Sequence, residues 1–148
     1  MKEKIIKLYR EFNHFGNQLN MDFEILAPGK VLYKMKVGKE HLATPIAAHG
    51  GALAGLMDAT LGVAGLSKMA EHGKIVSTVE FKINYLAPAK IHDELEALGH
   101  VISAGKRILY IEGEIYKFDG EEKIVIAKAN GTFNAYPAEK AKMHFIDG

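Results

Sequence analysis

The feature of the sequence that most limits the possible folds is an apolar stretch over residues 50–66, which is rich in glycine and alanine and contains one charged residue, Asp58. Its length and its central acid do not suit a membrane span. We therefore predict a buried helix over about 51–69, ended by a turn at Gly73. Because this helix is apolar on almost every side, it needs a sheet wrapped around it.

Runs rich in Val, Ile, Phe and Tyr lie on both sides of the helix, and most of them stop at a Gly or Pro turn. The expected strands cover residues 22–26, 30–37, 75–86, 93–103, 107–118 and 123–135. Short turns that contain glycine favour antiparallel pairing of successive strands. The sequence therefore predicts an α+β fold, in which a curved antiparallel meander sheet wraps a long central helix.

The length of the chain predicts a single domain over residues 1–148, because 148 residues can bury one core but not two. At the start, Ile5 and Tyr9 belong to a set of apolar residues at helical spacing, which predicts an amphipathic helix over about 2–15 that lies on the domain. A polar tail is expected over about 137–148. The start has no apolar stretch leading to a cleavage site, so we expect a cytoplasmic protein.

Composition and missing motifs exclude several classes of function. The chain has no cysteine, which excludes disulfides, thiolate zinc sites and a cysteine nucleophile. None of its seven histidines forms an i, i+4 pair on a helix, so we expect no metal site. The net charge of +1 gives no general attraction to nucleic acid or to a membrane. The motifs of serine hydrolases, P-loop proteins and dinucleotide-binding proteins do not occur, and no cofactor is expected.

Asp58 is the first candidate for a catalytic residue. An ionised carboxylate in an apolar helix is unfavourable unless it is paired, hydrogen-bonded or solvated in a cleft. From the helix alone, a simple hydrogen bond to a backbone or hydroxyl group explains Asp58 equally well. However, Asp58 follows His49, Gly50 and Gly51 by about two turns, and the amides at a helix start suit a developing oxyanion. We therefore expect a carboxylate base and an amide cradle to face one cleft.

Three glycines inside the expected helix, Gly55, Gly62 and Gly65, point to a close neighbour. Glycine within a helix costs roughly 0.5 to 1 kcal/mol relative to alanine. We therefore expect another backbone or a ligand to approach the helix on this side.

The segment HLATPIAAHGGALAGLMDATLGVAG, followed by VSTVEFKINYLAPAK, resembles the hotdog-fold thioesterases of the phenylacetate-degradation type. This family includes the mammalian thioesterase superfamily members and is related to the 4-hydroxybenzoyl-CoA thioesterases. The resemblance covers about residues 19–136, and its most specific part is HGG with an acid at the ninth position after the histidine. It implies a hotdog fold, homodimers whose sheets join edge to edge and that commonly pair into homotetramers, and active sites between subunits.

The resemblance also implies the roles of particular residues. It makes Asp58 the catalytic acid and Gly50 the amide donor to the thioester carbonyl, with His49 before it and Gly51 among the substrate-binding amides. It assigns Thr78 as a hydroxyl contributed by the opposing chain. Taken from the residues alone, His49 is equally consistent with a packed histidine that bonds a loop carbonyl.

The activity that follows is hydrolysis of an acyl-CoA thioester to a free acid and CoA, with no cofactor. Lys90, Lys106 and Arg107 lie at turns, where cations are usually just solvated; they are the candidates for binding the CoA phosphates. Ala43 departs from the family, which often carries an asparagine six residues before the motif histidine to orient water or substrate. Thr44 and His41 are the nearby side chains that offer a replacement.

Two other functions remain open at this point. One is a hotdog hydratase or dehydratase, although the motifs of those enzymes do not occur. The other is a non-catalytic domain that binds or senses acyl-CoA. Ala43 favours this second reading, while the presence of Asp58 in an apolar helix argues against it.

Overall fold

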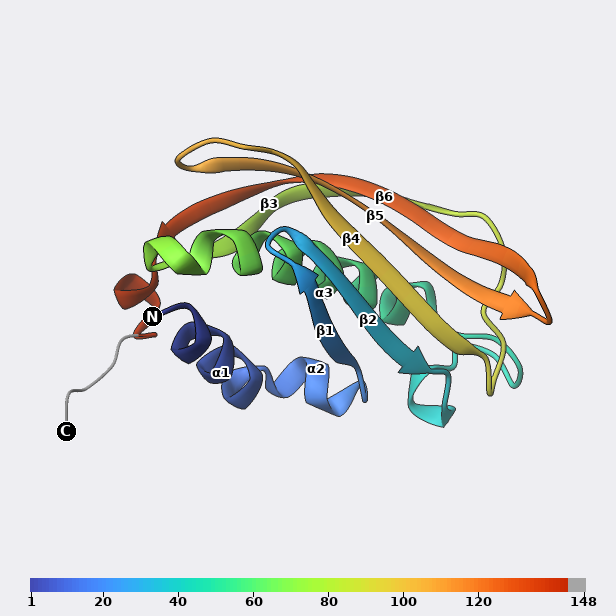
Figure 1. Cartoon of the computed structure of the whole chain (residues 1–148). Coiled ribbons are helices and arrows are strands. Elements are labelled where there is room, and N and C mark those ends of the chain that lie inside the picture. Colours follow the sequence, from blue (N-terminus) through green and yellow to red (C-terminus); the bar gives the residue numbers. More distant parts are fainter. Residues whose placement is uncertain (144–148) are drawn as a thin grey trace.

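The computed structural model describes residues 1–143 and contains three α-helices and six strands, with short 3-10 turns (Figure 1). The helices are α1 (Lys2–Phe12), α2 (His14–Gln18) and α3 (Gly50–Met69). The strands are β1 (Asp22–Ala27), β2 (Lys30–Lys36), β3 (Lys74–Tyr85), β4 (Glu94–Ala104), β5 (Ile108–Asp119) and β6 (Glu122–Pro137).

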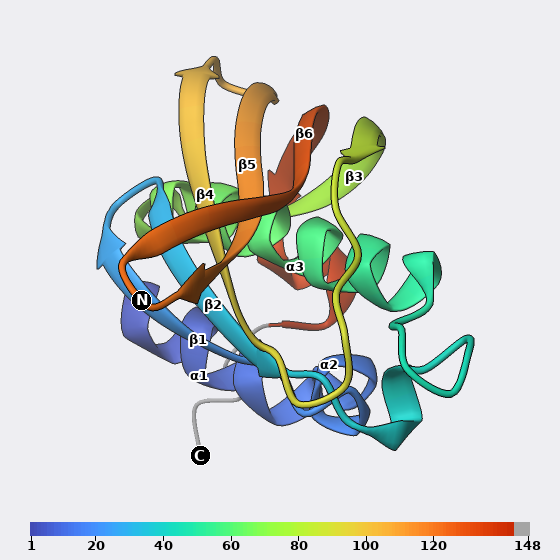
Figure 2. The same cartoon turned by 90° about the vertical axis from the view of Figure 1, so that its right-hand side faces the viewer.

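All six strands form one antiparallel sheet in the order β1-β2-β4-β5-β6-β3. The sheet is curved, as predicted (Figures 1 and 2). The predicted meander order is wrong, however, because β3 pairs with β6 and not with β4. The rule for successive strands applies to short turns, whereas residues 86–93 form a longer connection that crosses from one edge of the sheet to β4.

The central helix α3 lies in the hollow of the sheet. Helices α1 and α2 lie on the side of α3 that faces away from the sheet (Figure 2). Its residues Leu56, Met57, Leu61 and Ala64 are completely buried. This burial confirms the prediction of an enclosed helix. Helix α3 also positions the functional residues. It carries Asp58, and the HGG motif forms its start, with His49 as the N-cap.

The closest approach of the sheet to α3 depends on a glycine of the sheet. A Cβ atom on Gly99 in β4 would lie 2.7 Å from the backbone oxygen of Thr60. The helix glycines were expected to admit another backbone or a ligand. Gly55 faces the side chains of Phe15 and Leu19, and Gly65 faces side chains of the sheet, so neither admits a backbone, and the approach of a ligand stays a prediction. Sequence alone does not reveal on which side of a contact the small residue stands.

Strand β3 contains a β-bulge at Val79. Thr78 pairs with Phe133 and Glu80 pairs with Thr132, so Val79 has no counterpart on β6. The opposite strand makes room for the bulge at Gly131, where a Cβ atom would lie 2.6 Å from the Cβ atom of Phe81. A bulge adds one residue to a strand and changes its local direction and twist.

The predicted helix over residues 2–15 is two helices. Asn13 separates α1 from α2 and caps the second helix, because its side chain accepts a hydrogen bond from Gly16 N–H. At the other end, the predicted polar tail begins with the last residue of β6 and a 3-10 turn, Ala138–Ala141, and residues 144–148 lie outside the described part. Within residues 1–143, no helix is long and apolar enough to cross a membrane.

Candidate active site

Asp58 and Thr78 form the polar centre of the site. Thr78 Oγ1 on β3 donates a hydrogen bond of 2.7 Å to Asp58 Oδ1 on α3, and the carboxyl is half-buried. The resemblance implied that this hydroxyl comes from the opposing chain, whereas the structure places it on the Asp58 of its own chain. A carboxylate held in this way has one oxygen fixed and the other available to water or substrate.

A pocket of about 320 Å³ opens beside this pair. Its wall is mainly apolar and is formed by α1, α3, β3, β6 and the turn that follows β6. The lining residues are Tyr9, Asp58, Ala59, Gly62, Leu66, Ile75, Val76, Ser77, Thr78, Phe133, Ala141 and Met143. Burial raises the pKa of Tyr9, and the negative charge of Asp58 raises it further, so this phenol stays protonated at neutral pH.

The start of α3 is capped by His49. Its Nδ1 atom accepts a hydrogen bond of 2.7 Å from Gly51 N–H, and its backbone oxygen accepts from Ala52 and Leu53. The amide of Gly51, predicted to bind substrate, is therefore occupied within the chain. Among the hydrogen bonds of residues 1–143 there is no acceptor for Gly50 N–H, which leaves the amide at the positive end of the helix for a ligand.

The expected single cleft for Gly50 and Asp58 does not form within one chain. The two residues are eight positions apart on α3, which corresponds to about 12 Å along the helix axis. Gly50 lines a separate pocket, together with Leu53, Tyr85 and Pro88. One chain therefore presents the carboxylate and the free amide at two separate places.

Tyr85 contributes to the Gly50 pocket and was not predicted from the sequence. Its hydroxyl donates a hydrogen bond of 2.7 Å to Gly50 O. The ring lies against the glycine, so that a Cβ atom on Gly50 would meet the Tyr85 ring at 3.4 Å. The sequence offers a tyrosine near the end of a predicted strand as the only signal, and its partner depends on the topology of the sheet.

Neither side chain proposed to replace the missing asparagine is free to do so. His41 is buried, its Nδ1 accepts from Gly38 N–H at 3.0 Å, and its Nε2 lies 2.6 Å from Leu19 O. Thr44 Oγ1 accepts a hydrogen bond of 3.0 Å from Ala47 N–H inside a turn. Both residues shape the loop before α3, and Ala43 has no polar substitute from either of them.

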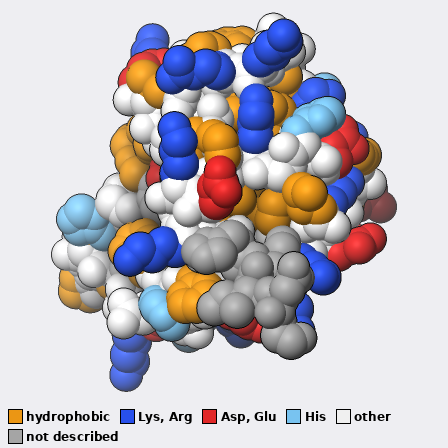
Figure 3. Space-filling model, turned by 90° about the vertical axis from the view of Figure 1, so that its left-hand side faces the viewer, with side chains coloured by type: hydrophobic (Ala, Val, Ile, Leu, Met, Phe, Trp, Pro, Cys, Tyr) orange, Lys and Arg blue, Asp and Glu red, His pale blue; other side chains and the backbone are white. Residues whose placement is uncertain are grey.

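The three candidate cations lie in two groups at opposite ends of the domain. Lys90 forms a β-bridge with Ala47, close to the start of α3. Lys106 O accepts a hydrogen bond from Lys74 Nζ, and both Lys106 and Arg107 belong to the β4–β5 turn near the end of α3. Figure 3 shows Lys and Arg side chains gathered over the upper part of this end of the molecule. One chain does not bring all three cations to one phosphate group.

The part of the chain that the structure describes contains no group of three His, Asp or Glu side chains that could hold a metal ion. The two pockets offer the Asp58 carboxylate, four hydroxyl side chains and the Gly50 amide. This set suits acyl transfer to water, in which a base activates the nucleophile and an amide stabilises an oxyanion.

Known proteins resemble this chain in sequence. The sequence model of the thioesterase superfamily matches residues 47–124, which are 78 of the 148 residues. Human acyl-coenzyme A thioesterase 13 is 36% identical over 88 residues, which cover 57% of this chain and 59% of the human protein. The chain thus spans less than two thirds of the length of the curated relatives that it matches.

Solved structures resemble it over most of its length. The Escherichia coli PaaI protein from the phenylacetic acid degradation operon superposes with a TM-score of 0.79 at 22% identity, covering 91% of this chain and 95% of that one. A hypothetical thioesterase from Streptococcus pneumoniae, solved with coenzyme A, gives a TM-score of 0.73 at 25% identity and covers 87% and 97%. The fold is the predicted hotdog fold, and the chain belongs to the thioesterase superfamily.

Proposed function

We propose that this protein hydrolyses acyl-CoA thioesters, with Asp58 as the catalytic carboxylate. The observation that carries the proposal is the half-buried Asp58, held by Thr78 at 2.7 Å beside an apolar pocket. Membership of the thioesterase superfamily supports it, as do the name of the human relative and the coenzyme A in the Streptococcus pneumoniae structure.

In the proposed reaction, a water molecule attacks the thioester carbonyl carbon while Asp58 accepts a proton from it. The carbonyl oxygen becomes an oxyanion, the carbon–sulfur bond then breaks, and Asp58 returns the proton to the leaving CoA thiolate. Thr78 fixes one carboxylate oxygen, so that the other faces the water. Direct attack by Asp58, followed by hydrolysis of the resulting anhydride, uses the same residue as a nucleophile.

The oxyanion needs an amide donor, and we assign this role to Gly50 of a second copy of the chain. Within one chain, Gly50 and Asp58 lie in different pockets, about 12 Å apart along α3. Strand β3 is an edge of the sheet and carries an exposed Val79, which is 58% accessible. Pairing of two such edges would protect the strand and place the ends of the two α3 helices near each other.

The CoA phosphates need positive charge at the mouth of the shared site. Lys106 and Arg107 lie on the same end of the domain as the Asp58 pocket, whereas Lys90 lies near Gly50. In a shared site, Lys90 of one copy and the Lys106–Arg107 turn of the other are alternative phosphate partners. Charge-assisted hydrogen bonds of this kind are the strong ones in phosphate recognition.

The proposed function is tested by measuring thiol release from a panel of acyl-CoAs with the native protein and with Asp58→Asn. We expect at least one thioester to be hydrolysed and the variant to lose a hundredfold or more in kcat/KM, which is the size of a general-base contribution. Asp119→Asn, on the β5–β6 turn, is the control for loss of a negative charge. Activity retained in Asp58→Asn would refute the assignment, and binding without turnover by the native protein would favour a sensing domain.

The assignment of Gly50 is tested with Gly50→Pro, which removes the amide hydrogen. Proline suits the first position of a helix, and His49 has the extended backbone that proline requires before it (φ −66°, ψ 137°). Gly50→Ala is the matched control, because it adds a side chain and keeps the amide. Loss of an oxyanion donor typically lowers kcat by about 100-fold to 1000-fold.

Mixing the two inactive variants separates a shared site from a site within one chain. After subunit exchange, a mixed dimer of Asp58→Asn and Gly50→Pro contains one intact shared site, and random pairing would restore about a quarter of the native activity. A site built within one chain would show no recovery. A monomer in light scattering would also refute the shared site.

A further inference from the structure

The pocket beside Asp58 has a size and a chemistry that restrict the acyl group. From the wall of this pocket we infer that the enzyme selects apolar acyl groups of medium length, and that Gly62 and Tyr9 set the upper limit. This inference rests on the proposed function, and it names a substrate class that the fold alone does not give.

The wall of the pocket excludes charged acyl groups. The wall is mainly apolar, and Leu66, Ile75, Val76 and Phe133 are part of it. Among residues 1–143, Asp58 is the one charged side chain in the lining, and it is negative. A carboxylate at the far end of the acyl chain would therefore meet an apolar wall without a cationic partner, which is strongly unfavourable.

The volume of the pocket limits the length of the acyl group. The space beside Asp58 measures about 320 Å³, which is near the small end of the usual range of ligand pockets. An octanoyl or a phenylacetyl group matches this volume. A palmitoyl group exceeds it and would have to leave part of its chain in solvent.

Gly62 preserves this space and is not required by the packing around it. A Cβ atom on Gly62 would lie 3.7 Å from the Phe133 ring, which is an ordinary contact. Gly65, one turn further along α3, differs, because a Cβ atom there would lie 3.0 Å from Ile111. An alanine at position 62 thus fits the fold and removes volume from the pocket.

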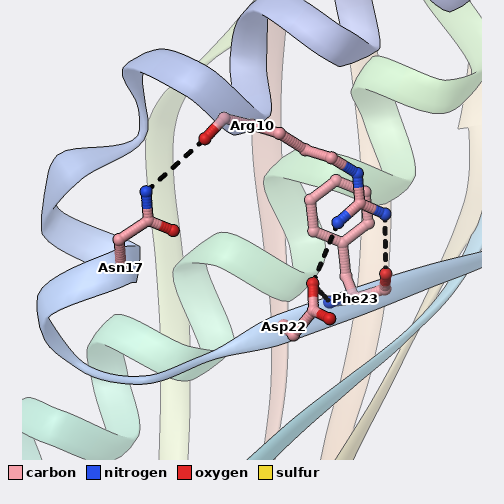
Figure 4. Close-up of polar contacts among 4 residues, drawn as sticks. All are labelled: Arg10, Asn17, Asp22 and Phe23. Atoms are coloured by element: carbon pink, nitrogen blue, oxygen red, sulfur yellow. Dashed lines mark hydrogen bonds and ion pairs between the residues drawn. The ribbon is translucent and has the colours of Figure 1, made fainter.

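Tyr9 closes the pocket from α1, and Arg10 holds that helix in place (Figure 4). The Arg10 guanidinium donates to Asp22 Oδ1 at 2.9 Å and to Phe23 O at 2.8 Å, and it lies 3.7 Å from the centre of the Phe23 ring. The Tyr9 ring packs beside Phe23, with ring centres 6.0 Å apart. Strand β1 therefore fixes the wall that Tyr9 provides.

The test compares butanoyl-CoA, octanoyl-CoA and palmitoyl-CoA as substrates of the native protein, Gly62→Ala and Tyr9→Ala. The native protein should prefer octanoyl-CoA to palmitoyl-CoA. Gly62→Ala should lower kcat/KM for octanoyl-CoA by about tenfold and leave butanoyl-CoA unchanged, because one methyl in an apolar pocket discriminates by about 10-fold to 200-fold. Tyr9→Ala should improve palmitoyl-CoA relative to octanoyl-CoA.

Controls separate the shape of the pocket from stability. Gly62→Ala should raise the melting temperature by roughly 2 to 4 °C, since alanine favours the helix. Gly55→Ala adds the same methyl to α3 outside the pocket, 3.3 Å from the Leu19 side chain, and should leave all three substrates unchanged.

The outcomes also separate the inference from the proposed function. Equal effects of Gly62→Ala on every acyl-CoA, or a native preference for palmitoyl-CoA, would overturn the inference while leaving the hydrolase in place. If no acyl-CoA releases thiol, the proposed function fails, and calorimetry with octanoyl-CoA decides about the pocket. Weaker binding of octanoyl-CoA to Gly62→Ala than to the native protein would then support the inferred role of the pocket, and equal binding would overturn that inference.

Discussion

The two sides of α3 use glycine in opposite ways. Toward the sheet, Gly99 and Gly113 stand on the strands, and Cβ atoms there would lie 2.7 Å from Thr60 O and 2.8 Å from Leu61 Cδ2. At the pocket, Gly62 stands on the helix itself, and a Cβ atom there would lie 3.7 Å from the Phe133 ring of β6. The sheet side is packed as closely as it can be, whereas the α1 side keeps an open pocket beside Asp58.

This difference indicates which side of the helix supports the fold and which supports chemistry. The strands of the sheet supply most of the large, fully buried side chains, including Leu95, Leu109 and Ile111. The α1 side is closed by a helix that a few polar contacts attach to β1. We therefore expect substitutions on the sheet side to affect mainly stability, and substitutions on the α1 side to affect mainly the substrate.

The largest effect is expected for Gly99→Ala. The new methyl would overlap the backbone of α3, which cannot move away as a side chain can, and we expect a loss of about 3 kcal/mol in the free energy of unfolding. Denaturant unfolding of Gly99→Ala and of Gly62→Ala measures the difference in stability effect between the two sides of α3. A Gly99→Ala protein as stable as the native one would show that the two sides are packed alike.

An intermediate effect is expected for Arg10→Ala on the α1 side. The variant loses a charged hydrogen bond to Phe23 O and the stacking of the guanidinium on the ring, so we expect about 1 to 2 kcal/mol of destabilisation. Hydrogen exchange should become faster in α1 and remain unchanged in β4 to β6. Arg10→Lys keeps the charge and loses the forked geometry, so it should resemble Arg10→Ala. Uniform acceleration across the chain would contradict a local attachment.

The smallest effect, and one of opposite sign, is expected for Tyr33→Phe. The Tyr33 hydroxyl is buried between the sheet and α1, and within residues 1–143 it makes no hydrogen bond of ordinary geometry. Burial raises its pKa, so that it stays neutral. Removing it should stabilise the protein by about 0.5 to 1 kcal/mol, because an unsatisfied buried polar group is unfavourable. A lower melting temperature would show that the neighbouring Tyr9 hydroxyl, which influences the Tyr33 pKa, forms a useful bond with it.

Much of the fold was readable from local patterns. The predicted helix over 51–69 and the six predicted strands agree with the structure to within about two residues at most ends. Apolar periodicity and Gly or Pro turns act over a few residues, so sequence reports them directly. The order of the strands depends on how β3 packs against β6, which is a long-range choice that local turns do not encode.

The candidate site was predictable in part, for a similar reason. Asp58 stands out because a lone acid in an apolar helix needs a physical explanation, and the structure supplies Thr78 as its partner. The pocket walls at Tyr9, Phe133 and Met143 come from three distant segments and were not foreseen. The separation of Gly50 from Asp58 follows from helix geometry, but the motif alone suggested one cleft.

The bulge at Val79 makes the number of residues in β3 important for the arrangement of the site. Before it, Thr78 turns toward α3 and reaches Asp58; after it, Phe81 and Tyr85 turn toward the same side, and Tyr85 reaches Gly50. Thr78 and Tyr85 are seven residues apart, so in a strand of the same sequence paired without the bulge, alternation would send one of these two groups to the opposite face. The bulge thus brings two groups with an odd spacing in the sequence to one face of β3, and one further residue inserted between Thr78 and Tyr85 would separate the two half-sites.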